Sequence, residues 1–221
     1  MSIVDILKKY NALDLIVYLI SELYIFYVRF SSGLMLIIKS KIWCVRIEKG
    51  SSVFGKIIFY RFPGSVIRIG ENFTSISNSF RASASTIFSP TRFKTLSPSA
   101  KILIGNDVGV NGLSITARSK SVIIGNGVMF APNVTIMDSS FHALWPPEGR
   151  LTNPDFESDD DVVIGNNVWL GSQVIVLKGV KIGNNSVIGA GSIVTKSIPE
   201  NCLAAGNPAK PIRFLNQTKE N

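Results

Sequence analysis

The sequence predicts an all-β fold, a parallel β-helix of hexapeptide repeats, preceded by a helical and apolar segment. Three observations predict it: aliphatic residues recur at every sixth position between residues 162 and 195, the same sequence phrase occurs earlier in the chain, and residues 5–43 are strongly apolar. The repeat is weighed first because a fixed period determines the whole architecture. We therefore divide the chain into a segment 1–49, a β-helix domain 50–215 and a short tail 216–221.

The composition is that of a globular protein with an excess of positive charge. The chain has 221 residues, of which 46% are hydrophobic, and a formal net charge of +8. This charge favours an anionic partner such as a phosphorylated cofactor, an acidic glycan or a lipid surface. The sequence contains no zinc-finger spacing, aromatic RNA-binding signature or basic helix, so we expect no nucleic-acid partner. Cys44 and Cys202 form no C-x-x-C pair and no secretory cleavage signature occurs, which predicts a cytoplasmic protein.

The N-terminal segment is predicted to be helical, with its apolar run at residues 13–28. A helix that spans a bilayer needs about 20 mainly apolar residues. Asp14, Glu22 and Arg29 interrupt this run, so we do not predict a transmembrane helix.

Two interpretations of residues 5–43 stay open. The helix could pack on the domain or on sister subunits. It could instead make a peripheral contact with the inner face of a membrane, because aromatic residues alternate there with Lys39, Lys41 and Arg46, as in interfacial segments.

Residues 50–100 alternate short β-branched runs with Gly, Ser and Pro, which predicts short strands and turns without fixing their topology. The first recognisable repeat unit is V-I-R-I-G at residues 66–70.

The clearest repeat lies further on. Its six aliphatic positions, each six residues after the last, are Ile164, Leu170, Val176, Ile182, Ile188 and Val194. A second apolar series precedes it by two residues, at Val162, Val168, Val174 and Val180. An α-helix keeps no face at period six, whereas a short strand followed by a turn does. We expect the aliphatic residues to point inward, and glycine or asparagine to accept the positive φ that each corner requires.

The same phrase occurs at residues 102–108 (I-L-I-G-N-D-V) and 122–128 (V-I-I-G-N-G-V). Three hexapeptides that close one triangular coil, stacked on the next coil, bury a continuous prism of aliphatic side chains. Residues 139–161 break the pattern with Pro146, Pro147 and Pro154 and should form a protruding loop. Long loops in compact repeat domains are usually functional or disordered, and this one holds the only histidine of the chain, His142.

Three motifs resemble those of hexapeptide-repeat acyltransferases, especially sugar and polysaccharide O-acetyltransferases. They are I-G-N-N-V-W-L-G-S at 164–172, V-I-G-A-G-S-I-V-T-K at 187–196 and A-G-N-P-A-K-P-I-R at 205–213. The resemblance covers residues 101–215. It implies a left-handed parallel β-helix, a homotrimer with active sites between subunits, and acetyl-CoA as the acyl donor without a metal.

The resemblance also assigns binding positions. Coenzyme A contacts carried over by position are Trp169, Gly171, Ser172, Ala190, Thr195, Lys196, Lys210 and Arg213. The cations among them suit the phosphates of the cofactor. Alternatively, these lysine and arginine side chains only solvate the surface of the coil.

His142 lies where the family places its catalytic histidine, and histidine is the natural general base near pH 7. Asp138 could orient its ring, or could be an aspartate that stabilises a turn. Asn111 resembles a family asparagine that contacts the acceptor and the developing charge, or is a corner asparagine in the left-handed conformation. A backbone N–H near Gly171 is the expected oxyanion donor. Neither cysteine has a base nearby in sequence, so direct transfer through a ternary complex is expected.

The predicted reaction is O-acetylation of a sugar hydroxyl on a polysaccharide or its lipid-linked precursor. The alternatives are a nucleotide-sugar N-acetyltransferase and a non-catalytic structural hexapeptide-repeat protein. A γ-type carbonic anhydrase is excluded because its zinc needs three histidines and the chain has one.

Overall fold

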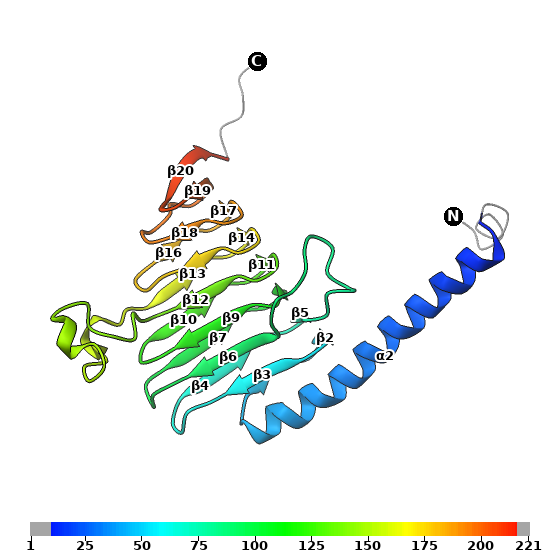
Figure 1. The fold of residues 1–221 in the computed structure, drawn as a ribbon, viewed down its shortest axis with the longest axis horizontal. Helices are drawn as coiled ribbons and strands as arrows, with labels where there is room; N and C mark the ends of the chain where they lie inside the picture. The colour runs from blue at the N-terminus through cyan, green and yellow to red at the C-terminus, as the bar shows by residue number, and fades with distance from the viewer. Residues whose placement is uncertain (1–9, 216–221) are drawn as a thin grey trace, which may run out of the picture.

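The structure, a computed structural model, describes residues 10–215. Three parallel sheets wrap into a prism, a long helix leaves the N-terminal end of the prism, and a loop protrudes from its side (Figure 1). Residues 5–9 of the predicted apolar segment and the predicted tail 216–221 lie outside the described residues.

The helix is α2 (Ala12–Ile42), and sequence signals mark both of its ends. The side chain of Asn11 accepts a hydrogen bond from the Asp14 backbone N–H at 2.8 Å, which caps the first turn. Asp14 in the first turn and Lys39 and Lys41 in the last turn complement the helix dipole. Among residues 10–215, none of the helices combines the length and the apolarity that a membrane crossing requires.

The C-terminal half of α2 is attached to the first coil of the prism. Ser32 and Leu36 are buried, and the Ser32 hydroxyl accepts a hydrogen bond from the backbone N–H of Gly55 at 2.9 Å. The Lys39 ammonium donates to the carbonyl of Ile57 at 2.8 Å. The N-terminal half projects away from the domain (Figure 1).

The three sheets are named A, B and C in the order in which each coil passes through them. Sheet A contains β1 (Arg46–Ile47), β4 (Val66–Ile69), β7 (Lys101–Ile104), β10 (Ser121–Ile124), β13 (Val162–Ile164) and β16 (Lys181–Ile182). Sheet B contains β2 (Ser52–Phe54), β5 (Thr74–Ile76), β8 (Gly109–Asn111), β11 (Met129–Phe130), β14 (Trp169–Leu170), β17 (Val187–Ile188), β19 (Cys202–Gly206) and β20 (Ala209–Phe214). Sheet C contains β3 (Ile57–Tyr60), β6 (Thr91–Thr95), β9 (Ser114–Ala117), β12 (Thr135–Met137), β15 (Ile175–Val176) and β18 (Ile193–Val194).

The core is the interior of the prism, where equivalent residues of successive coils stack in register. In sheet A, for example, Ile104 pairs with Ile124, which pairs with Ile164. All six aliphatic positions of the predicted period are at most 2% exposed. The predicted inward direction of the aliphatic residues is therefore confirmed. The first strand of the prism, β1, already pairs with β4, so sheet A begins four positions before the expected boundary at residue 50.

The corner between sheets A and B explains the recurring Ile-Gly-Asn phrase. The Asn126 side chain accepts the backbone N–H of Asn106 at 2.8 Å, and the Asn166 side chain accepts that of Asn126 at 2.8 Å. A Cβ on Gly125 would lie 2.6 Å from the Asn166 side-chain oxygen, so glycine is required there for this close approach. The positive φ of the corner lies two positions after this glycine, at Gly127 (65°) and at Asn167 (55°) in the next coil, so glycine and asparagine accept it as predicted.

Two segments leave the coils. Residues 139–161 connect sheet C to sheet A between β12 and β13 and include the 3-10 turns η1 (Pro147–Gly149) and η2 (Phe156–Ser158). Residues 77–90 connect sheet B to sheet C between β5 and β6, and the sequence did not single them out. The antiparallel pair β19–β20 ends the described prism.

Candidate active site

His142 lies near the start of the loop 139–161 with its side chain exposed. Its ring nitrogen Nδ1 is 2.7 Å from the backbone carbonyl oxygen of Arg150. A carbonyl oxygen only accepts hydrogen bonds, so this contact places the proton on Nδ1 and leaves a lone pair on Nε2. The ring is thereby held in the tautomer that a general base needs.

The backbone around the histidine is tightly constrained. Phe141 has a φ of 66°, an unusual value for a bulky side chain, and its N–H donates to the Ser139 hydroxyl at 2.7 Å. Ala143 is buried, and its N–H donates to the carbonyl of Asn153 at 3.0 Å. Strained backbone beside a candidate base is a recurring feature of functional sites.

Asp138 is fully buried and accepts three backbone hydrogen bonds. Their donors are the N–H groups of Arg118 (2.7 Å), Ser119 (3.1 Å) and Lys120 (2.9 Å). Burial raises the pKa of the Asp138 carboxyl, although these three donors oppose the rise. The carboxylate thus stabilises the turn after β9, and the group that contacts His142 Nδ1 is the Arg150 carbonyl instead.

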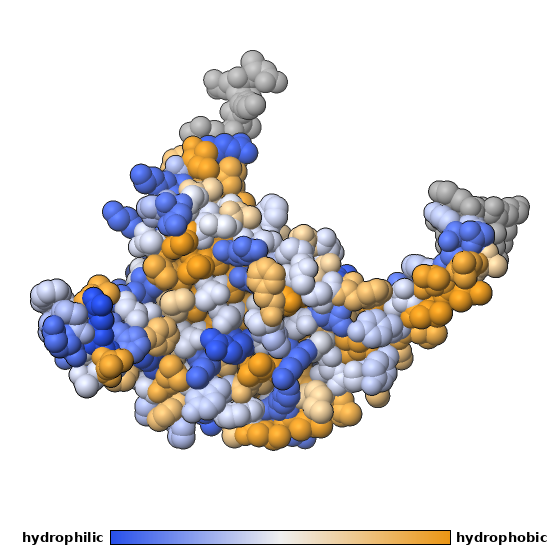
Figure 2. Space-filling view, viewed as in Figure 1, coloured by the Kyte–Doolittle hydropathy of each residue, from blue (hydrophilic) through white to orange (hydrophobic). Residues whose placement is uncertain are grey.

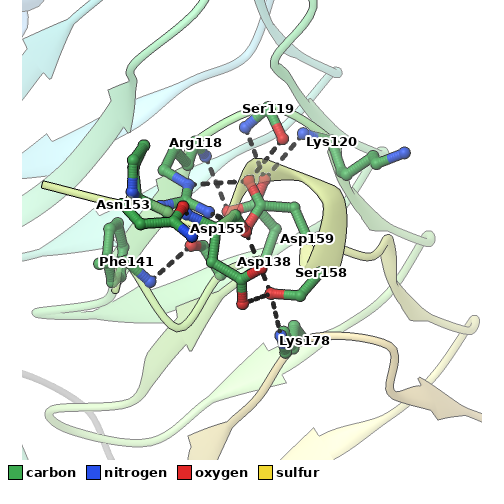
Figure 3. Close-up of polar contacts among 12 residues, drawn as sticks. Arg118, Ser119, Lys120, Asp138, Phe141, Asn153, Asp155, Ser158, Asp159 and Lys178 are labelled. Carbon is green, nitrogen blue, oxygen red and sulfur yellow. Dashed lines mark hydrogen bonds and ion pairs between the residues drawn. The ribbon is translucent and has the colours of Figure 1, made fainter. Parts of the chain in front are cut away.

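Arg118 joins the loop to the prism (Figure 3). Its guanidinium binds Asp159 in a bidentate manner, with Nε 2.8 Å from one carboxylate oxygen and Nη2 2.6 Å from the other. Both side chains are buried, at 5% and 0% exposure. Burial alone would raise the pKa of Asp159, but the Arg118 guanidinium and the hydroxyls of Ser119 and Ser139 outweigh it and hold the pKa below its ordinary value.

The same guanidinium also contacts the loop backbone and two aromatic rings. It donates to the carbonyl oxygens of Pro154 and Asp155, the latter at 2.8 Å. It lies 4.5 Å from the ring centre of Phe156 and 5.8 Å from that of Phe141, the residue before His142. Arg118 therefore fixes both ends of the loop that carries the histidine.

A second group of predicted residues lies at the corner between sheets B and C. Asn111 ends β8, Gly171 and Ser172 follow β14, and Ala190 follows β17, so they stack in successive coils. A Cβ on Gly171 would lie 2.6 Å from the backbone N of Ala190, which leaves room only for glycine.

Asn111 is not the left-handed residue of this corner, because that conformation belongs to Gly112 (φ 58°). The Asn111 side chain instead donates to the carbonyl of Phe130 at 2.8 Å in the next coil. The alternative of a corner asparagine in the left-handed conformation is therefore wrong.

The remaining predicted cofactor residues are all exposed. Trp169 lies on the outer face of sheet B beside Met129, and Lys210 and Arg213 lie on β20 of the same sheet. Thr195 and Lys196 follow β18 and lie at the corner between sheets C and A. The loop with His142 leaves from that same corner, two coils earlier.

Within one chain, the predicted residues thus fall on opposite edges of sheet C. His142, Thr195 and Lys196 belong to the edge toward sheet A, and Asn111, Gly171 and Ala190 to the edge toward sheet B. A site that combines both sets needs two copies of the chain whose opposite edges meet.

Sequence reasoning missed Arg118, Arg150 and Asp159. Asp159 belongs to the acidic run 159–161 of the loop, and Arg118 gives only a weak signal, a cation directly after an apolar repeat strand. Among residues 10–215, no group of three or more His, Cys, Asp or Glu side chains is placed to hold a metal ion.

Comparison with known proteins supports this assignment of the repeats. The family model for bacterial transferase hexapeptide (six repeats) matches residues 161–196. The galactoside O-acetyltransferase of Lactococcus lactis subsp. lactis (strain IL1403) is 50% identical over 97 residues, 44% of this chain and 45% of that protein. The galactoside O-acetyltransferase of Escherichia coli (strain K12) is 43% identical over 117 residues, 53% of this chain and 56% of that protein. The chain spans about half the length of these curated relatives.

Among solved structures, a mutant of AntD, an N-acyltransferase from Bacillus cereus, in complex with dTDP-4-amino-4,6-dideoxyglucose and coenzyme A, has a TM-score of 0.59. It is 17% identical, and the match covers 82% of this chain and 89% of that chain, which shows a shared fold. The predicted resemblance to hexapeptide-repeat sugar O-acetyltransferases is confirmed by the family model and the two relatives.

Proposed function

We propose that this protein transfers an acetyl group from acetyl-CoA to a sugar hydroxyl. The observation that carries the proposal is the contact between His142 Nδ1 and the Arg150 carbonyl, because it leaves Nε2 free to accept a proton. The names of the two relatives, both galactoside O-acetyltransferases, support a sugar hydroxyl as the acceptor.

The proposed chemistry is a direct transfer. Nε2 of His142 accepts the hydroxyl proton as the sugar oxygen attacks the thioester carbonyl carbon, and a backbone N–H near Gly171 stabilises the oxyanion of the tetrahedral intermediate. The carbon–sulfur bond then breaks, and the coenzyme A thiolate recovers the proton from Nε2. A covalent acetyl-cysteine is disfavoured, because burial raises the pKa of the Cys202 thiol and Cys44 lies just after α2, at the first coil of the prism.

Several of the predicted cofactor residues are exposed and support acetyl-CoA as the donor. Lys196, Lys210 and Arg213 supply cations for its phosphates, and Trp169 offers an exposed apolar ring on sheet B. Coenzyme A in complex with the AntD mutant is consistent with such a donor on this fold, although that likeness itself concerns the fold only.

The proposed assembly is a homotrimer of left-handed coils with active sites between subunits. The two predicted residue sets lie on opposite edges of sheet C, and closed three-fold symmetry would bring one edge against the other in every interface. We place the enzyme in the cytoplasm, where the acceptor would be a polysaccharide or its lipid-linked precursor.

The His142→Ala variant tests the base. We expect a folded protein that still binds acetyl-CoA but transfers acetyl groups hundreds-fold more slowly, about the effect of losing a general base. The matched control is Leu151→Ala, which removes a 93% exposed side chain from the same loop and should keep the wild-type rate. Near-normal turnover by His142→Ala would exclude the mechanism.

Mass spectrometry of candidate glycans incubated with the enzyme and acetyl-CoA identifies the product. An acetyl group that mild alkali removes is an ester on a hydroxyl, whereas a stable one is an amide and favours the alternative nucleotide-sugar N-acetyltransferase. A protein that shows no binding of acetyl-CoA favours the non-catalytic structural alternative.

A further inference from the structure

Helix α2 presents an exposed apolar face along most of its length. Its outer face, defined by Ile16, Leu19, Leu23, Phe26, Phe30 and Ile37, consists of side chains that are 52–69% exposed. These positions follow the spacing of one helix side and span about 32 Å along the axis. Figure 2 shows apolar residues gathered along the projecting part of the helix.

The charged residues between positions 13 and 38 of the helix lie elsewhere. At about 100° per residue, Asp14 falls on the opposite side of the helix, and Glu22 and Arg29 fall along one flank, toward that side. The buried residues Ser32 and Leu36, which attach the helix to the prism, lie opposite the outer face as well. The helix is therefore amphipathic. The prism covers part of its domain-facing side, whereas its apolar side is exposed.

Loop 77–90 contacts the helix through Tyr24, which lies outside this outer face. The rings of Tyr24 and Phe80 are in edge contact, with centres 5.4 Å apart, and the Asn78 side chain donates to the Tyr24 hydroxyl at 3.1 Å. Phe80 and Phe88 are 61% and 71% exposed. The Tyr24 contacts attach the loop to the helix on a side other than the outer face.

We propose that the outer face of α2 binds the surface of an anionic phospholipid membrane, with the helix lying in the plane of the interface. An interfacial helix needs an apolar side, a polar side held by the protein or by water, and nearby cations. Arg29 and Arg81 flank the surface, each within 6.0 Å of the Phe54 ring centre, and the net charge of +8 complements anionic headgroups.

The shape of the face favours lipid over a second copy of the helix. A helix partner in a coiled coil covers a narrow seam, and charged residues on both sides of that seam usually fix the pairing. Here the exposed residues Ile20, Tyr27 and Ile38 widen the face on one side, where no charged residue between positions 13 and 38 borders it. Glu22 and Arg29 lie along the other side alone, so the face lacks the paired charges of a coiled-coil seam.

The test is sedimentation of the full-length protein with vesicles of phosphatidylcholine, with and without phosphatidylglycerol, in the absence of acetyl donor and acceptor. We expect binding that increases with the anionic lipid and weakens with salt. Leu23→Glu should lower the partition coefficient at least about tenfold, because it places a charge in the apolar contact. The control, Ser21→Glu, adds the same charge on the inner side and should bind as the wild type does.

Thermal unfolding and acetyl-CoA binding establish that both variants are folded. The proposal is overturned if the wild-type protein does not sediment with anionic vesicles. It is also overturned if Leu23→Glu leaves vesicle binding unchanged and instead reduces the oligomer mass measured by light scattering, since the face then binds another copy. Because the assay contains no reaction, its outcome is independent of the proposed enzymatic activity.

Discussion

Arg118 holds the loop of His142 through one buried ion pair with Asp159. A substitution of Asp159 therefore tests the role of this ion pair. Asp159→Asn keeps the shape of the side chain but removes the charge from a buried pair, which should lower the free energy of unfolding by about 3 kcal/mol. The loosened loop should also lower kcat about 10- to 100-fold while leaving the affinity for acetyl-CoA unchanged. Glu157→Gln, an exposed change in the same loop, is the matched control.

The pH dependence of this stability difference has a definite sign. The pKa of Asp159 is lowered in the folded state, so its contribution is fully present above the unfolded pKa, near 4, and is lost as the pH falls through the folded pKa. Denaturant unfolding should therefore show a larger gap between wild type and Asp159→Asn at pH 7 than at pH 3. An equal gap at both values would contradict the assigned role of the carboxylate.

At the scale of single residues, the sequence predicts well which side chains are candidates for catalysis. It predicts poorly which other residues orient those side chains. His142 is identifiable because it interrupts a repeat. The contact of His142 with the Arg150 carbonyl cannot be identified from the sequence, because this contact forms only when the loop folds back over eight positions. Arg118 and Asp159 are 41 positions apart, and no local pattern connects them.

At the scale of elements, Asn133 couples the loop 77–90 to the prism. Its side chain accepts the Phe88 N–H at 2.8 Å and donates to the Thr86 carbonyl at 2.9 Å, and its φ is 66°. Asn133→Gly preserves the left-handed backbone and removes only these two contacts, each worth about 1 kcal/mol. Trypsin should then cleave after Arg81, in that loop, about tenfold faster or more.

The matched control for this experiment is Asn167→Gly. It makes the same change at another left-handed corner residue, with a φ of 55°, between sheets A and B and away from the loop. If both variants accelerated cleavage equally, the faster cleavage would reflect a general loss of stability of the coils. It would not reflect the loss of the two hydrogen bonds between Asn133 and the loop.

The elements themselves divide into a predictable part and an unpredictable part. The coils are predictable because each rung repeats the same local requirement, for example a glycine at 125 or 165 that makes room for the asparagine of the next coil. The predicted apolar run 13–28 is part of a longer helix, Ala12–Ile42, which continues through Gly33. The loop 77–90 escaped prediction because its contacts with Tyr24 and Asn133 are long-range.

At the scale of the whole molecule, the separation of the candidate residues predicts complementation between subunits. His142→Ala and Asn111→Ala chains should each be inactive alone. In mixed trimers made by co-expression, a site with an intact His142 from one chain and an intact Asn111 from its neighbour re-forms, with about a quarter of wild-type activity at equal mixing. Activity no higher than that of either variant alone would place both residues of a site in one chain.

At this scale the repeat period of the sequence predicts the fold class, whereas the homotrimer is expected only from the resemblance to the acyltransferase family. The inward positions Ile164 and Ile182 reveal the prism because burial imposes the same residue type at every turn. The proposed interface between two edges of sheet C would leave no comparable period in the sequence, since an interface uses each residue once.

The closed ends of the prism have a further consequence. A stack of parallel strands exposes unpaired backbone groups at its first and last turns, and such groups invite the next molecule to add on. Here Leu36 of α2 enters the core at one end, and β20 reverses direction against β19 at the other. These two non-repeating elements cap the ends of the β-helix. They prevent the end-to-end addition of further molecules, which would otherwise produce a fibre.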